Sequence, residues 1–285
     1  MASIAVTGAS RGIGFATALV LGRAGHTVYA FMRDPGRSTD LAETAAKEGL
    51  AIRISAIDVD SDASVREAIG SILKSHGPLD VLVNNAGIER TGSVEELDIS
   101  EVRAVMETNY FGALRCIQAV MPEMRARRSG CIINVSSVGG RVSSPPLAAY
   151  SASKFALEAL SEALAQEAKM FNIRIAIVQP GIIDTAMARR IGSEAAPSVY
   201  PHTRRMAALF ALSLERPTPP SVVAEKILEI IGSGEWKLRY PVGPDAEGYL
   251  QRRASMTDEQ WIERGAADDE TWSRSIERTF SRKLI

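Results

Sequence analysis

Short apolar runs alternate along this chain with longer segments in which apolar residues recur at helical spacing. An apolar run over residues 3–7 is followed by a helical pattern over about 12–24 and by a second apolar run over 27–32. The alternation continues, with apolar runs over 51–57, 79–83, 131–135, 173–178 and 237–242. Strands joined by crossover helices pair in parallel, so the pattern predicts an α/β fold with a single doubly wound, Rossmann-like parallel sheet of about seven strands.

Two segments depart from the repeating unit. Residues 1–243 contain no linker or repeat, which predicts one Rossmann-like domain, but within it residues 186–220 form what we expect to be an irregular insertion and a lid over the substrate. Residues 244–285 are rich in charge and carry spaced aromatic residues such as Trp261 and Trp272. That spacing favours a helical C-terminal extension packed on the parent domain or on a second subunit.

Charge and cysteine content narrow the choice of ligand. The 33 basic and 34 acidic residues leave a formal net charge of -1, which argues against general attraction to nucleic acid or to an anionic membrane. Neither cysteine, Cys116 or Cys131, has a metal-ligand spacing around it, so no metal site is expected. The chain shows no apolar run long enough to span a membrane, and we expect a cytoplasmic protein with a small-molecule ligand.

A glycine-rich turn follows the first predicted strand. Residues 7–14 read Thr-Gly-Ala-Ser-Arg-Gly-Ile-Gly, and a helical pattern begins at once. Glycines let backbone N–H groups and a helix N-terminus approach a pyrophosphate, so these residues predict a dinucleotide loop with contacts from Gly8, Ser10, Arg11, Gly12, Ile13 and Gly14. A tight strand-to-helix turn without a ligand is the alternative for the glycine cluster alone.

The residue after the second predicted strand bears on the choice of cofactor. An acidic residue at that position suits the ribose hydroxyls of NAD, whereas an arginine suits the 2′-phosphate of NADP. Arg33 stands there, and with Arg11 it could clamp a phosphate, so NADP(H) is favoured over NAD although Asp34 follows directly. Solvated surface charges are the alternative for both arginines.

Tyr150 and Lys154 lie four residues apart at the start of a long helical pattern, which puts both side chains on one face. A nearby ammonium favours the phenolate, so we expect a lowered pKa for Tyr150 and a role for it as the acid or base of a proton transfer. Ser137, just after the strand over 131–135, lies at the sheet edge where its hydroxyl could bind the reacting oxygen.

Six motifs together resemble the short-chain dehydrogenase/reductase family, in its Tyr-x-x-x-Lys branch: the glycine loop over 7–14, Asn84-Asn85-Ala86-Gly87, Asn109, Ser137, Tyr150 with Lys154, and Pro180-Gly181 with Thr185. The resemblance implies Asn109, Ser137, Tyr150 and Lys154 as catalytic residues. It also implies cofactor contacts from Asp58, Asn85, Ala86, Gly87, Tyr150, Lys154, Pro180, Gly181, Ile183 and Thr185. A homodimer or homotetramer, formed through the long helices that include residues 112–125 and 154–168, is typical of the family.

The resemblance is strongest to members similar to 17β-hydroxysteroid and retinol dehydrogenases, and it implies hydride transfer between NADP(H) and a ketone, aldehyde or alcohol. The apolar residues Leu147, Met187, Tyr200, Met206 and Phe210 would suit a hydrophobic substrate. Two alternatives stay open: a dinucleotide-binding sensor or regulator that does not turn over, and an epimerase or dehydratase that uses a bound nicotinamide transiently.

Overall fold

A single parallel sheet organises the protein. The computed structural model describes residues 1–193 and 197–280, with side chains described as far as residue 277. The sheet has seven strands in the order β3-β2-β1-β4-β5-β6-β7, and every neighbouring pair is parallel. The strands are β1 (Ser3–Thr7), β2 (Thr27–Met32), β3 (Ile52–Ala56), β4 (Val81–Asn84), β5 (Gly130–Val135), β6 (Ile173–Pro180) and β7 (Arg239–Val242). The predicted fold class is confirmed, and no strand end differs from its predicted end by more than two residues.

The strand order reverses at the centre of the sheet. β1 pairs with β2 on one side and with β4 on the other, and Val6 lies opposite both Ala30 and Val83. The chain therefore leaves β1 and β4 in opposite directions, which opens a crevice at their carboxyl ends.

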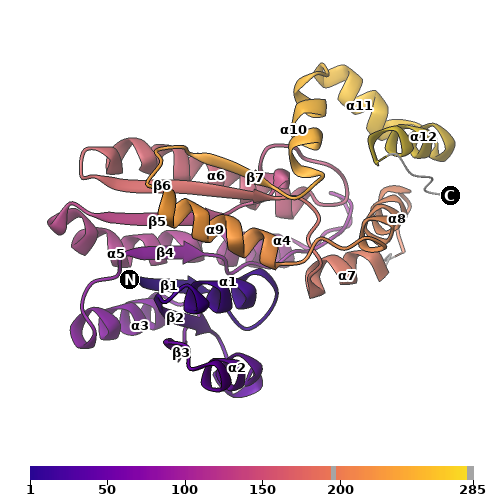
Figure 1. Ribbon diagram of the computed structural model, residues 1–285. Helices are drawn as coiled ribbons and strands as arrows, with labels where there is room; N and C mark the ends of the chain where they lie inside the picture. The colour runs from indigo at the N-terminus through magenta and orange to yellow at the C-terminus, as the bar shows by residue number, and fades with distance from the viewer. Residues whose placement is uncertain (194–196, 281–285) are drawn as a thin grey trace.

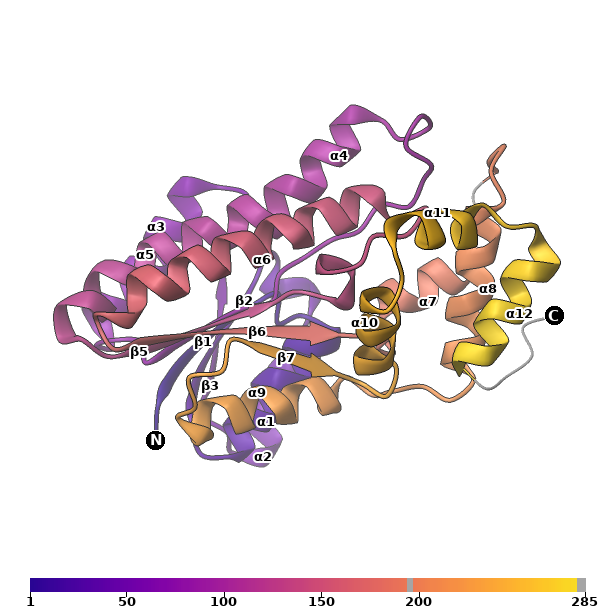
Figure 2. The ribbon, with the colours of Figure 1, turned by 90° about the horizontal axis from the view of Figure 1, so that it is seen from above.

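Helices cover both faces of the sheet (Figures 1 and 2). Ile4 and Val6 of β1 belong to one core, and the intervening Ala5 belongs to the other, as the alternation of side chains along a strand requires. The first core takes apolar residues from α1 (Gly12–Arg23), α2 (Asp40–Glu48) and α9 (Ser221–Ser233). The second takes them from α3 (Asp62–Ser75), α5 (Gly112–Arg127) and α6 (Ala148–Lys169).

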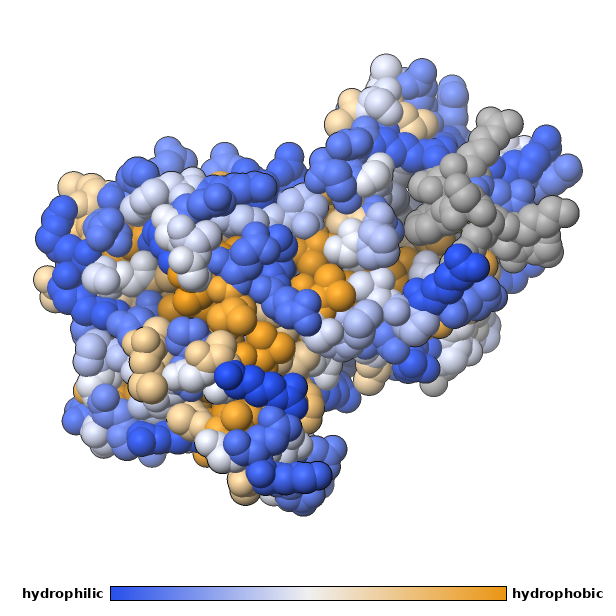
Figure 3. All heavy atoms as spheres, viewed as in Figure 1, coloured by the Kyte–Doolittle hydropathy of each residue, from blue (hydrophilic) through white to orange (hydrophobic). Residues whose placement is uncertain are grey.

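The outer surface of the first face is mostly polar, and apolar side chains gather over α1 and α9 (Figure 3). Partly buried Ile13 and Phe15 of α1 and Val222 and Leu228 of α9 pack there on the core. No helix in the described parts of the chain is long and apolar enough to cross a bilayer.

Further helices gather beyond the carboxyl ends of the strands (Figure 2). The prediction that residues 186–220 are irregular is wrong. This insertion contains two helices, α7 (Ala186–Ser193) and α8 (His202–Leu214), which pack on each other. Residues 194–196 of that insertion lie outside the described residues. The tail forms α10 (Ala246–Ala254), α11 (Asp258–Ala266) and α12 (Asp269–Phe280).

The tail helices pack on the parent domain, which was one of the two expectations from the sequence. The indole Nε1 of Trp261 donates to the carbonyl oxygen of Ser143, 3.2 Å away. Asp269, at the start of α12, pairs with Arg204 and Arg205 of α8, and Trp272 is buried. The tail and the insertion thus form one helical layer over the carboxyl edge of the sheet.

Candidate active site

A cavity of about 640 Å³ follows the carboxyl edge of the sheet from the glycine loop to the helical layer. Nearly all the predicted site residues line it: Gly8, Ser10, Arg11, Gly12, Ile13, Arg33, Asp58, Asn85, Ala86, Gly87, Ser137, Tyr150, Lys154, Pro180, Gly181, Ile183 and Thr185. Gly14 and Asn109 do not line the cavity and act from behind it. The fold thus brings together residues that lie up to 177 positions apart, as Gly8 and Thr185 do.

The glycine loop allows the backbone to come very close to its neighbours. Gly8 and Gly12 have left-handed φ angles of +67° and +58°. A Cβ on Gly14 would lie 2.3 Å from the carbonyl oxygen of Gly8, so only glycine fits there. Helix α1 begins at Gly12, and no side chain caps its first N–H groups. These unsatisfied donors face the cavity and fit the pyrophosphate of a dinucleotide.

The loop is fixed to the end of β4 by hydrogen bonds. The Oγ1 of Thr7 accepts from the backbone N–H groups of Asn85 and Ala86 at 3.0 and 3.1 Å. In return, the amide of Asn85 donates to the carbonyl oxygens of Thr7 and Gly8. Asn84 instead donates to Asn134 of β5 at 2.8 Å in the buried interior, which is a structural contact.

Two exposed arginines face the end of the cavity near β2. Arg11 and Arg33 line it, and neither guanidinium forms a hydrogen bond or ion pair with any described residue. Asp34, which weakened the sequence argument for NADP, lines the same end of the cavity, where its carboxylate accepts from the Gly36 N–H and pairs with Arg37. The arrangement can hold a second anionic group besides a pyrophosphate.

Tyr150, Ser137 and Lys154 meet at the middle of the cavity. Helix α6 begins at Ala148, so Tyr150 lies in its first turn and Lys154 in the next. The Oγ of Ser137, next to the Tyr150 hydroxyl, accepts from the Gly139 N–H at 3.0 Å and donates to the carbonyl oxygen of Pro180 at 3.5 Å. The Nζ of Lys154 lies 5.7 Å from the centre of the Tyr150 ring and donates to the carbonyl oxygen of Val135 at 2.9 Å.

Burial controls the protonation of both groups. It raises the pKa of Tyr150 to about 12, and the nearby charge of Glu89 adds to that rise while the Ser137 hydroxyl opposes it. Burial also lowers the pKa of Lys154 to about 8, against the opposite influence of Glu158. The sequence predicted a lowered pKa for Tyr150, and for the polypeptide alone this prediction is wrong. The loss of hydration on burial outweighs the effect of the Lys154 ammonium, because its Nζ is directed at the carbonyl oxygen of Val135.

Asn109 lies in η2 (Glu107–Phe111), a π-helical turn between α4 (Ile99–Met106) and α5. Its Oδ1 accepts from the N–H of Ile88 at 2.8 Å, and its Nδ2 donates to the carbonyl oxygen of Ile88 and to the Oγ of Ser153. Such turns often mark functional sites. Asn109 thereby ties the loop after β4 to α6, one residue before Lys154.

The remaining part of the cavity is mostly apolar. Leu147, Met187, Met206, Leu209 and Phe210 line it, from the segment before α6 and from the insertion. Tyr200 was predicted to belong to this set, but that prediction is wrong because its ring stacks on His202 outside the cavity.

The tail supplies a wall that the sequence did not indicate. Tyr249 of α10 lines the cavity, and its hydroxyl lies 2.8 Å from the Oγ of Ser144. Asp245 accepts from the N–H of Ile182 at 2.9 Å, next to the segment over 180–185. Glu89 also lines the cavity. None of these residues belongs to a motif, and only the tertiary fold brings them to the site.

No group of three or more possible metal ligands occurs among residues 1–193 and 197–280. The side chains that meet at the middle of the cavity offer a phenol, a hydroxyl and an ammonium, next to a site for an anionic dinucleotide.

Comparisons with known proteins agree on the family. A family model described as short chain dehydrogenase matches residues 2–196. The chain is 36% identical to Oxidoreductase BOA17 of Botryotinia fuckeliana, over 90% of this chain and 96% of the relative. It is also 36% identical to Retinol dehydrogenase 8 of Bos taurus, over 83% of this chain and 80% of the relative.

A similar solved structure is that of a single-substitution variant of actinorhodin polyketide ketoreductase with NADPH. The two share 29% sequence identity and superpose with a TM-score of 0.75, over 84% of this chain and 95% of the other. The similarity extends beyond the glycine loop to most of the sheet and helices.

Proposed function

This chain belongs to the short-chain dehydrogenase family, and we propose that it interconverts a ketone or aldehyde and an alcohol on a small, mostly apolar molecule with NADP(H) as cofactor. The observation that carries the proposal is the position of Tyr150, next to Ser137 and one helical turn before Lys154 in the wall of the cavity. The family assignment supports a dinucleotide-dependent oxidoreductase. The choice of NADP(H) and of a mostly apolar substrate rests on the residues described below.

A bound nicotinamide would supply the hydride in reduction or accept it in oxidation. The residues of this chain handle the proton. Because the pKa of Tyr150 is raised to about 12, its phenol is protonated near neutrality and can donate to the carbonyl oxygen as negative charge develops there. The hydroxyl of Ser137 donates a hydrogen bond to the same oxygen.

Lys154 stabilises the phenolate that proton donation leaves behind. Its ammonium is charged near neutrality, because its pKa of about 8 still lies above pH 7. A phenolate created within the buried site attracts that cation strongly, since few waters screen the pair. Asn109 holds the loop after β4 and helix α6 together through its hydrogen bonds with Ile88 and Ser153.

Arg11 and Arg33 support NADP(H) as the cofactor. Both line the cavity at the end where the adenosine of a dinucleotide would lie if its pyrophosphate bound at the N-terminus of α1. The carboxylate of Asp34 at the same end is engaged by the Gly36 N–H and by Arg37. The similar ketoreductase was solved with NADPH, which favours the same choice.

The apolar lining supports a hydrophobic substrate. Leu147, Met187, Met206, Leu209 and Phe210 surround the space next to Tyr150. The hydroxyls of Ser144 and Tyr249 at its edge are hydrogen-bonded to each other. A relative named for retinol, a largely apolar alcohol, is in line with this choice.

We also propose the division into residues 1–243 and a C-terminal extension over 244–285, and assembly as a homodimer or homotetramer. Phe111 of η2 and Phe155 of α6 expose 42% and 43% of their surface on adjoining elements, where a second copy could cover them. The molar mass in solution, measured by light scattering, tests this part.

The test of function is absorbance of the reduced nicotinamide against a panel of ketones, aldehydes and alcohols, with NADPH and NADH in parallel. We expect turnover of an apolar carbonyl compound that prefers NADPH and is lost in Tyr150→Phe. Tight cofactor binding without turnover of any compound would favour the sensor alternative instead.

A further inference from the structure

Glu89 is a buried carboxylate at the active site for which the mechanism above has no use. It follows the cofactor-lining residues 85–87 closely, and its side chain is only 4% exposed. Its position is rigid, because the amide of Asn109 binds both the N–H and the carbonyl oxygen of the preceding Ile88. A carboxylate in such a place is costly unless a cation accompanies it.

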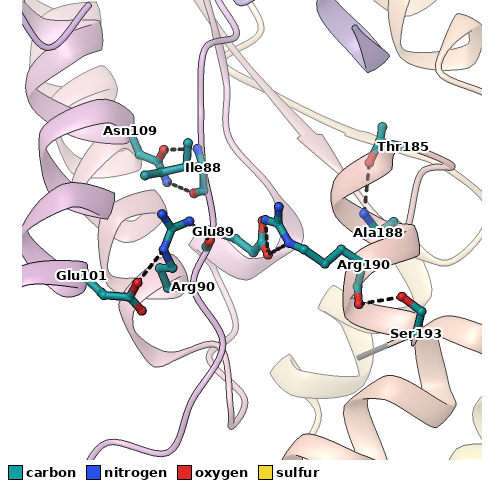
Figure 4. Close-up of polar contacts among 9 residues, drawn as sticks. All are labelled: Ile88, Glu89, Arg90, Glu101, Asn109, Thr185, Ala188, Arg190 and Ser193. Carbon is teal, nitrogen blue, oxygen red and sulfur yellow. Dashed lines mark hydrogen bonds and ion pairs between the residues drawn. The ribbon is translucent and has the colours of Figure 1, made fainter. Parts of the chain in front are cut away.

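Arg190 provides that cation from helix α7. It lies on α7, which starts immediately after the segment over 180–185, and its Nε and Nη2 donate to the Oε1 of Glu89 at 3.2 and 2.6 Å (Figure 4). The Nη2 also donates to the Oε2. Two segments 101 residues apart in sequence are thus joined through a fork-shaped contact that fixes orientation as well as distance.

The charge of Glu89 acts on the catalytic phenol. Tyr150 shares the cavity wall with the Ser137 hydroxyl from the end of β5, with Lys154 from α6 and with Glu89 from the loop after β4. The negative charge of Glu89 opposes formation of the phenolate. Around Glu89 itself, Arg190 is the basic side chain bound to the carboxylate, since Arg90 directs its guanidinium to the Glu89 carbonyl oxygen and to Glu101.

We propose that Arg190 is a positioning residue for the reaction, which holds α7 against the loop after β4 and compensates the negative charge of Glu89 beside Tyr150. The inference rests on the proposed function of Tyr150. The same ion pair then bears on the position of α7 beside the substrate space and on the readiness of Tyr150 to ionise.

Four variants separate the two roles. Arg190→Met removes both the positive charge and the two-nitrogen contact with the Glu89 carboxylate, whereas Arg190→Lys keeps only the charge. The double variant Glu89→Gln with Arg190→Met removes both charges of the pair. Arg204→Met serves as the matched control, because it removes an arginine of α8 whose partner Asp269 keeps Arg205. Alcohol oxidation with NADP⁺ is measured from pH 6 to 11, since this direction requires the phenolate and its rate rises as Tyr150 ionises. The positive charge of an oxidised nicotinamide would lower the pKa of Tyr150 from about 12, its value in the polypeptide alone, into that range.

In Arg190→Met, we expect the midpoint of that rise to move upward by roughly half a pH unit to one unit, because an uncompensated carboxylate disfavours the phenolate. The double variant should return the midpoint to the wild-type value, but KM should stay raised because α7 is no longer held. Arg190→Lys should keep the midpoint and raise KM, and Arg204→Met should change neither. A wild-type midpoint in Arg190→Met, or the same shifted midpoint in the double variant, overturns the proposal.

Urea unfolding gives a readout that does not need turnover. A buried unpaired carboxylate is destabilising, so the urea midpoint should fall further in Arg190→Met than in the double variant. If the wild-type protein turns over no substrate while this order is observed, the proposed function fails and the contact between α7 and the loop stands. Equal midpoints in the two variants overturn the contact itself.

Discussion

Lys154 should lower the free energy of unfolding of the protein, although catalysis requires it. Its side chain is almost fully buried, and burial lowers its pKa from an ordinary 10.5 to about 8. That difference corresponds to about 3 kcal/mol of unfavourable free energy when the ammonium is charged in the folded state. In Lys154→Met the penalty disappears, although the carbonyl oxygen of Val135 loses a donor at a cost of about 1 to 3 kcal/mol. The net change at pH 7 should be neutral to stabilising by about 2 kcal/mol, while activity is lost.

The pH dependence tests this reasoning more sharply than the net change does. Between pH 8 and 10.5 the unfolded chain still binds the Lys154 proton and the folded chain does not, so the contribution of Lys154 to stability rises with pH across that window. Buried Cys116 and Cys131, with pKa values raised to about 12 and 11, act in the opposite direction, but equally in both proteins. The measured quantity is therefore the difference between wild type and Lys154→Met.

Urea unfolding followed by tryptophan fluorescence at pH 7, 8, 9 and 10 gives that difference. We expect the stability of the wild type relative to Lys154→Met to increase by about 2 to 3 kcal/mol from pH 7 to 10. A difference that stays constant with pH would refute the argument, because it would mean that Lys154 titrates alike in the folded and unfolded chains.

Three further substitutions follow from the cavity. Arg33→Ala should lower kcat/KM for NADPH about tenfold and leave that for NADH unchanged, since one exposed charge-assisted contact to a phosphate contributes about 1.5 kcal/mol; equal losses with both cofactors would contradict a role at the 2′-phosphate. Asn109→Ala should destabilise the protein by about 2 to 4 kcal/mol in urea unfolding, because both backbone groups of Ile88 lose a buried partner. Gly14→Ala should abolish cofactor binding in a fluorescence titration, since its Cβ would meet the Gly8 oxygen at 2.3 Å and displace the loop; wild-type affinity would show that the loop can adjust.

The sequence predicted what depends on neighbours along the chain. The spacing of Tyr150 and Lys154 predicts that they share one helical face, and both residues do lie in the helix that begins at Ala148. The glycine loop lies at the end of β1 because a strand, a turn and a helix follow one another within a short stretch of chain. For the same reason, Ser137 was found from its place just after β5.

Other features depend on which distant segments meet. Glu89 and Arg190 carry no local pattern that pairs them, and Tyr249 reaches the cavity only because α10 folds back over the sheet edge. The insertion appeared irregular since its prolines interrupt the helical spacing, yet α7 and α8 form within it. The pKa of Tyr150 was predicted in the wrong direction because desolvation depends on burial, which no spacing of two residues reveals.

The position of α10 has a consequence for how the protein is made. The groups that would bind the dinucleotide and transfer the proton all lie between Gly8 and Thr185, whereas Asp245 and Tyr249 are added after β7, the last strand. A ribosome therefore completes the nucleotide side before the wall facing the substrate exists, and domains generally begin to fold from the N-terminal side during synthesis. Cofactor captured by such a nascent chain could stabilise the sheet while the final helices are still being translated.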